Sequence, residues 1–150
     1  MAVADTTNFT DAGHHSLQGG SATQLIRIWE VYLGGHATSS APCIMTLARH
    51  STVGATLTAA RLAALHPSSA ALAAPPTGFA ASTTKPQRSA TLYLLTPSFN
   101  AFGGIVRWVA APEEDISMLG NTASLGELGI SAFTGGTPGL TSSHIILEPA

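Results

Sequence analysis

The chain carries very little charge. Only 9% of its 150 residues are Asp, Glu, Lys or Arg, and the net charge is -2, whereas a soluble globular domain usually has about 25% charged residues. The five arginines and one lysine are scattered singly, so no basic cluster is available to neutralise a run of phosphates. We therefore expect no direct contact with nucleic acid. Disorder is not expected either, because 45% of the residues are apolar.

Cysteine and long hydrophobic runs are also scarce. Cys43 is the only cysteine, which excludes an intrachain disulfide scaffold and a cysteine-rich zinc site. Proline and glycine interrupt the uncharged stretches from Leu62 to Thr84 and from Ala90 to Val106, and a membrane-spanning helix needs about 20 predominantly apolar residues. The segment from Met1 to Thr10 has no apolar core of a secretory signal. Neither a membrane span nor export by that route is expected.

The chain does contain short runs rich in β-branched, aromatic and other apolar residues, separated by Gly, Pro, Ser and Thr. They predict about eight or nine strands with turns every 8–12 residues, the pattern of an all-β antiparallel β-sandwich, and the jelly roll is the preferred topology. The run 56–65 suits a strand at its start and a helix later, and we assign it as a strand. We predict a short extended N-terminal arm over residues 1–20 and one sandwich domain over 21–150. The predicted strands cover residues 23–33, 42–50, 56–65, 79–84, 90–96, 104–110, 124–134 and 142–148.

The predicted strand 23–33 is apolar on both faces and is expected to stop at Gly34-Gly35. A strand covered on both faces lies in the middle of an assembly, or one of its faces meets another subunit. We therefore expect Trp29, Tyr32 and Trp108 to lie in the core or in an oligomer contact. If the faces of Arg27 and Arg107 are buried, each needs an acidic partner, and Glu30 is one candidate.

The sequence contains no recognisable catalytic or cofactor-binding pattern. The six histidines show no spacing suited to a metal site, and the glycine pairs lack the spacing of phosphate-binding loops. The run Glu113-Glu114-Asp115 is interpreted as a solvated turn in preference to a glycosidase carboxylate or a calcium ligand set. We expect no enzyme activity, no metal, no cofactor and no small-molecule substrate.

Five runs of the sequence carry a resemblance to a known family. They extend from Leu25 to Gly35, Ile44 to His50, Leu65 to Ala71, Gly103 to Trp108 and Ser143 to Glu148. Together they are similar to small tailed-bacteriophage head-decoration, or cement, proteins with a jelly-roll fold. The resemblance implies homotrimers, made in the host cytoplasm, that sit on the capsid surface of the virion and bridge neighbouring major capsid protein subunits. It implies no chemical residues.

Under this interpretation the N-terminal arm and the loops contact the capsid, and Thr7, Asn8 and Phe9 are the candidate contact residues. Two other hypotheses stay open. One is a carbohydrate-binding or host-adhesion β-sandwich module of a virion. The other is a jelly-roll shell protein that assembles into a capsid by itself. Fold alone does not decide between them, because sandwiches carry many functions.

Overall fold

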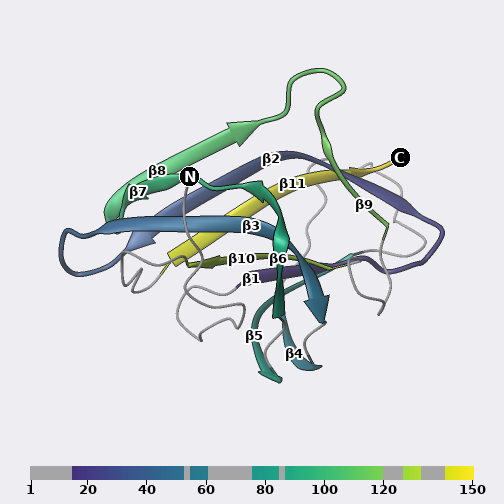
Figure 1. Ribbon diagram of the computed structural model, residues 1–150, viewed down its shortest axis with the longest axis horizontal. Helices are drawn as coiled ribbons and strands as arrows, with labels where there is room; N and C mark the ends of the chain where they lie inside the picture. Colours follow the sequence, from purple (N-terminus) through teal and green to yellow (C-terminus); the bar gives the residue numbers. More distant parts are fainter. Residues whose placement is uncertain (1–14, 53–54, 61–75, 85–86, 120–126, 133–140) are drawn as a thin grey trace.

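A computed structural model describes residues 15–52, 55–60, 76–84, 87–119, 127–132 and 141–150. Within these residues the protein consists of eleven strands and no helix. The strands form two antiparallel sheets that pack against each other as a β-sandwich (Figure 1). The predicted fold class is confirmed at this level, and the jelly-roll connectivity stays a prediction.

The larger sheet has seven strands, and β10, from late in the chain, lies at its centre. It separates β1 from β3, with Leu17 opposite Leu128 on one side and Leu47 opposite Ile130 on the other. β7 (Ser98–Asn100) pairs with the first residues of β3. The remaining order is β4 (Ala55–Ala60), β5 (Thr77–Thr84), β1 (His15–Gln18), β10 (Glu127–Ala132), β3 (Pro42–Thr52) and β6 (Gln87–Leu95).

The smaller sheet has four strands arranged around β2 (Leu25–His36). On one side β2 pairs along nearly its whole length with β11 (Thr141–Pro149). On the other side its first half pairs with β9 (Ile116–Leu119) and its second half with β8 (Phe102–Val109). One long strand therefore holds three partners in place.

A β-bulge at Trp29 explains the apolar pattern of β2. Leu147 of β11 lies opposite Ile28 and the preceding Ile146 lies opposite Glu30, so Trp29 has no opposite residue. An extra residue of this kind shifts the alternation by one position. The buried residues are accordingly Ile26 and Ile28 before the bulge, and Val31 and Leu33 after it. The prediction that β2 has two apolar faces was therefore wrong: both sets point to the same core, and the pattern requires no second subunit.

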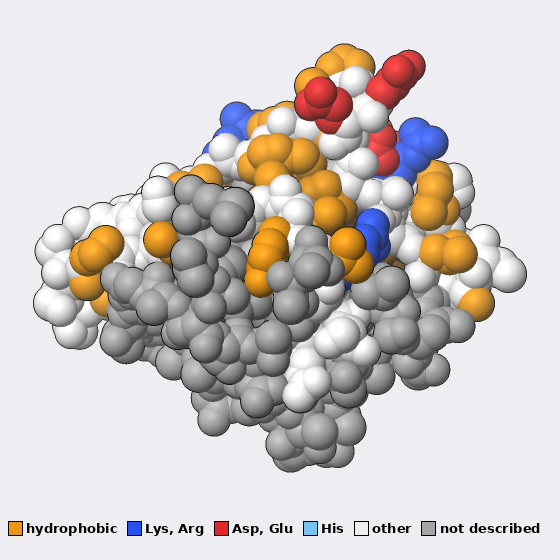
Figure 2. All heavy atoms as spheres, in the orientation of Figure 1, with side chains coloured by type: hydrophobic (Ala, Val, Ile, Leu, Met, Phe, Trp, Pro, Cys, Tyr) orange, Lys and Arg blue, Asp and Glu red, His pale blue; other side chains and the backbone are white. Residues whose placement is uncertain are grey.

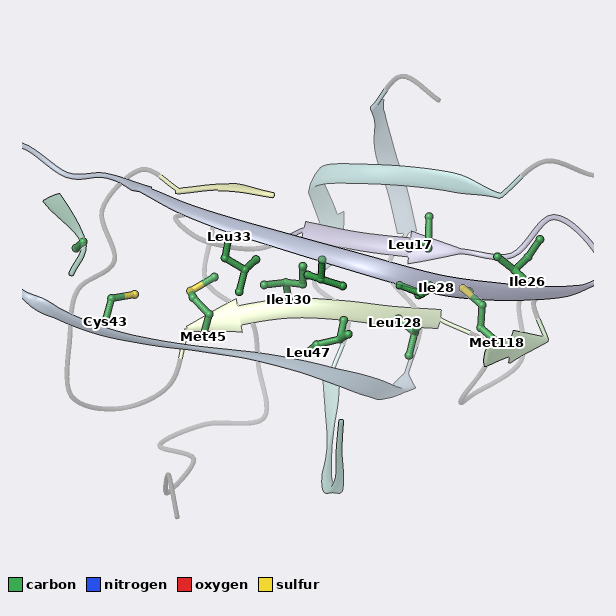
Figure 3. Packing of buried hydrophobic residues seen from close by; sticks show 12 residues of the cluster. Leu17, Ile26, Ile28, Leu33, Cys43, Met45, Leu47, Met118, Leu128 and Ile130 are labelled. Atoms are coloured by element: carbon green, nitrogen blue, oxygen red, sulfur yellow. The ribbon is translucent and has the colours of Figure 1, made fainter. Parts of the chain in front are cut away.

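The core lies between the two sheets, where apolar side chains of both meet (Figure 3). β2 contributes Ile26, Ile28 and Leu33 from the smaller sheet. Full burial of a Val, Leu, Ile or Met side chain contributes about 1.5–3 kcal/mol relative to exposure, so the ten buried residues of these types supply the main stabilisation. The facing members in Figure 3 are Leu17, Cys43, Met45, Leu47, Leu128 and Ile130 of the larger sheet, and Met118 of β9 completes the cluster.

Two predicted boundaries need correction. Residues 15–18, expected in the arm, form β1 between β10 and β5, because Ser16 and Leu17 are buried there and the backbone completes both ladders. The sandwich therefore begins earlier than residue 21, and residues 1–14 lie outside the described residues. β2 also does not stop at Gly34 but continues through His36.

The reason for Gly35 is a close approach of backbone. A Cβ on Gly35 would overlap the carbonyl oxygen of Ala101 and lie 2.6 Å from its carbonyl carbon. That carbonyl accepts a hydrogen bond from the amide of Ala37 at 2.9 Å, and the amide of Ala101 donates to the carbonyl of Ala41 at 2.8 Å. Glycine is needed here for space and not for a turn.

Candidate binding face

The side of the smaller sheet turned away from the core carries a cluster of interacting polar side chains. Because Val31 and Leu33 point into the core, their neighbours on β2 point outward, and the register places residues of β8 and β11 beside them. We call this surface the outer face. It comprises Glu30, Tyr32, Gly34 and His36 of β2, Phe102, Ile105, Arg107 and Val109 of β8, and Ser142, His144 and Ile146 of β11.

A row of three side chains crosses the middle of the outer face. Tyr32 lies opposite Arg107 on one side and His144 on the other. The guanidinium carbon of Arg107 is 5.4 Å from the centre of the Tyr32 ring, within cation–π range. The Tyr32 and His144 rings are 5.8 Å apart and inclined at 72°, an edge-to-face contact. The row is thus held together by ring contacts across three strands.

An ion pair between Arg107 and Glu30 fixes this row. The Glu30 side chain is only 12% exposed, and hydrogen bonds from Arg107 and then from Tyr32 hold its pKa below the usual carboxyl value. The same hydrogen bond to Glu30 raises the pKa of Tyr32, and Glu30 likewise raises the pKa of Arg107. Glu30 is therefore ionised and Tyr32 and Arg107 are protonated at neutral pH.

Beside the row lies an open hollow of about 440 Å³. It exists because Gly34 has no side chain where its neighbours do: Ile105 stands on one side of it and Ser142 on the other. The Ser142 hydroxyl is hydrogen-bonded to Nε2 of His36 at 3.0 Å. Tyr32, His144 and Ile146 complete the wall. The hollow is of a size that holds a small molecule or side chains of a partner, with both apolar and polar lining.

β8 adds exposed apolar side chains to this surface. Ile105 is 75% exposed, Phe102 60% and Val109 51%. Single exposed apolar residues need no explanation, but several on one strand beside a hollow are typical of a contact surface.

The three aromatic residues predicted for the core or an oligomer contact lie in three different environments. Tyr32 lies on the outer face and not in the core, because the bulge turns its side of β2 outward, whereas Trp108 is half-buried and packs against the core cluster. Trp29 is at the bulge, and its ring nitrogen is buried with no hydrogen-bond partner among the described residues. An oligomer contact of Trp29, Tyr32 or Trp108 stays a prediction. Thr7, Asn8 and Phe9 lie outside the described residues.

The prediction about the arginines applied only if their faces were buried, and neither side chain is buried: Arg27 is 44% exposed and Arg107 57%. Arg107 nevertheless pairs with Glu30. Arg27 instead lies 3.8 Å from the carboxylate of Asp115. Four residues of the outer face were not predicted as site residues: Gly34, Ile105, Ser142 and His144. The alternation of Ile105, Arg107 and Val109 along one strand already indicated a shared face.

Other chemistry is not apparent in the described part of the chain. Its His, Cys, Asp and Glu residues form no group of three that could hold a metal ion. Cys43 is buried, and burial raises the pKa of its thiol. Among the described residues there is also no helix with the length and hydrophobicity to cross a membrane.

Comparisons with known proteins find no relative. No protein-family model matches the chain, and neither a curated protein nor a solved structure matches it. The function has to be inferred from the chemistry of the outer face and its surroundings.

Proposed function

We propose that the protein is a head-decoration protein that binds the outside of a bacteriophage capsid and bridges neighbouring major capsid protein subunits as a homotrimer. The observation that carries the proposal is the outer face, where Phe102, Ile105 and Val109 are exposed beside a hollow. The strand that carries them pairs with β2 along a long hydrogen-bonded ladder. The five runs that resemble cement proteins add support, because three of them contribute β2, β8 and β11.

A weakly charged surface suits such a role. Interactions between exposed charges are screened by salt, whereas apolar contact is not weakened in this way. Repetition across a lattice also multiplies affinity, since each bound protomer holds its neighbours at high effective concentration. Modest contacts made by Ile105 and Val109 are then sufficient for stable attachment.

The decisive experiment mixes the purified protein with phage heads that lack it. Saturable co-sedimentation at a fixed ratio to the major capsid protein, by a species of trimeric mass in light scattering, is the expected result. Ile105→Lys should reduce occupancy, and Leu92→Lys serves as the control, because Leu92 is an apolar residue on β6 of the other sheet that is 39% exposed. Absence of wild-type binding overturns the proposal, and closed particles formed by the chain alone would identify a self-assembling shell protein.

The proposal also assigns capsid contact to Thr7, Asn8 and Phe9. Removing residues 1–11 should lower head occupancy while the circular dichroism spectrum of the sandwich stays unchanged. Unaltered occupancy would remove these residues from the contact.

A second candidate function is a carbohydrate-binding or host-adhesion module. The observation in its favour is the hollow itself, in which the Tyr32 ring stands next to the polar groups of Ser142 and His144. Saturable binding to an immobilised glycan, lost in Tyr32→Ala, would support it over capsid binding.

A further inference from the structure

β8 is an open edge of the smaller sheet. Among the described strands it pairs with β2 alone. The amide of Ala110 donates to the carbonyl of Trp29 at 2.9 Å, which continues the β2–β8 register. Because successive residues of a strand direct their backbone groups to opposite sides, Val106 and Trp108 bond to β2. The N–H and C=O groups of Ile105, Arg107 and Val109 therefore face away from the sheet.

This edge has few of the usual protections. Natural edge strands are blunted by lysine, proline, inward charges or very short length. β8 has eight residues and contains neither lysine nor proline. Its only charge, Arg107, is engaged by Glu30. Ile105 and Val109, on either side of it, present exposed apolar side chains. The edge is therefore a good template for one more strand.

The turn that follows β8 carries negative charge. The amide of Glu114 donates to the carbonyl of Ala111 at 3.0 Å, and Glu113 has a positive φ of 68°. These features, with Pro112 second, describe a type II turn in which glycine is the favoured residue at the position of Glu113. Both glutamates are exposed, and Figure 2 shows acidic side chains gathered at this projection. No ion pair of theirs occurs among the described residues, whereas Asp115 faces Arg27.

We propose that the edge of β8 binds an extended segment of a partner protein as an added antiparallel strand. Alternate apolar side chains of the segment pack on Ile105 and Val109. One or two Lys or Arg residues at its N-terminal end face Glu113 and Glu114, because an antiparallel strand begins where β8 ends. This inference deepens the proposed function and rests on it only for the source of the segment, the major capsid protein.

The charges argue against a second copy of β8 as the occupant. In an antiparallel pair of two β8 strands, the residues next to Glu113 and Glu114 would come from the beginning of the other β8 and the chain just before it. Residues 92–103 contain no Lys or Arg. A register centred on Arg107 would also place two arginines opposite each other, and like charges directly opposite are destabilising.

The test uses synthetic peptides and the full chain. The first peptide is Lys-Lys-Thr-Val-Thr-Val-Thr-Val with a fluorescent label, and the second replaces both lysines by glutamates. In fluorescence anisotropy the lysine peptide should bind saturably, and the glutamate peptide at least about threefold more weakly, given about 0.2–1 kcal/mol for each exposed ion pair. The combined change Glu113→Gln and Glu114→Gln should remove this difference. Glu148→Gln, on β11, is the matched control and should preserve it.

Backbone variants separate strand addition from simple stickiness. Ile105→Pro removes one open-edge N–H and should reduce binding of the lysine peptide about fivefold, given about 1 kcal/mol for one hydrogen bond; if circular dichroism shows that it fails to fold, Val109→Pro, which removes another open-edge N–H, takes its place. Failure of the wild-type chain to bind the lysine peptide overturns the inference, even where heads are bound. Peptide binding with these sensitivities by a chain that does not bind heads supports the open edge and overturns the proposed function alone.

Discussion

Gly35→Ala is expected to be strongly destabilising, although it adds only one methyl group near the end of β2. The new Cβ would overlap the carbonyl of Ala101, which is backbone and cannot turn aside as a side chain does. Both backbone hydrogen bonds of Ala101, to Ala37 and Ala41, hold that carbonyl in place. Relief of the overlap therefore requires the connection between β7 and β8 to move.

The magnitude follows from these contacts. Overpacking costs about 1–3 kcal/mol, and weakening a backbone hydrogen bond adds about 1 kcal/mol, so a loss near 3 kcal/mol is expected. In a chain of this length that corresponds to a fall in Tm of about 6–12 °C. Thermal and urea unfolding, followed by circular dichroism, measure it.

The adjacent Gly34→Ala is the matched control. Its Cβ would lie 3.2 Å from the hydroxyl oxygen of Ser142, a side-chain atom that can shift. The lower backbone entropy of alanine in the unfolded chain offsets this by about 0.5–1 kcal/mol. Its stability should stay within about 1 kcal/mol of wild type. Equal stability of the two variants would refute the close approach of Gly35 to Ala101 and with it the continuation of β2 through His36.

Two further predictions concern titration and one concerns reactivity. Arg107→Gln should raise the pKa of Glu30 toward its ordinary value in an NMR titration of side-chain carboxyl carbons. Because the pKa of Glu30 is lowered in the folded wild type, the ion pair stabilises the fold above the unfolded pKa of about 4.3. This stabilisation is lost as the pH falls through the folded pKa, so the variant should lose less stability in acid than the wild type. An unchanged Glu30 pKa in the variant would contradict this prediction. Glu30→Ala should lower the pKa of Tyr32, whose rise comes mainly from its hydrogen bond to Glu30, as measured by ultraviolet titration in a Tyr93→Phe background; no shift would show that this hydrogen bond is absent. Cys43, which is 1% exposed with a raised thiol pKa, should react with a thiol reagent only as fast as the chain unfolds, and rapid reaction in the native state would contradict its burial.

Local sequence patterns were sufficient to predict the strands that lie in runs of β-branched, aromatic and other apolar residues. β2, β3, β5, β6, β8, β10 and β11 all overlap predicted runs, and the described part of 56–65 is the strand β4 as assigned. The short strands β1, β7 and β9 were missed. Each has three or four residues and exists because a distant strand supplies its partner, as Leu128 does for Leu17. Such pairing leaves little trace in local composition.

The outer face could be predicted only in part. Glu30 was one candidate partner for an arginine on a buried face, and the structure pairs it with Arg107, whose side chain is exposed. The β-bulge at Trp29 prevented a correct prediction of the face of Tyr32, because strict alternation across the bulge assigns Tyr32 to the same face as the buried Ile26 and Ile28. The side chains that share a row with Tyr32 come from residues 107 and 144, and only the long-range register shows that they meet.

The central place of β10 has a consequence for how the chain folds. Its residues, Glu127–Ala132, join β1, with β5 and β4 beyond it, to β3 and β6. Until they have emerged from the ribosome, the larger sheet consists of two separate pieces, and β2 still lacks β11. The chain must close loops of this length before strand pairing can stabilise it. The complete larger sheet therefore forms only after these residues are synthesised, on the millisecond-to-second scale expected of non-local β proteins. During that interval the unpaired edges of β1 and β3 are the places where a growing chain is exposed to mispairing with its neighbours.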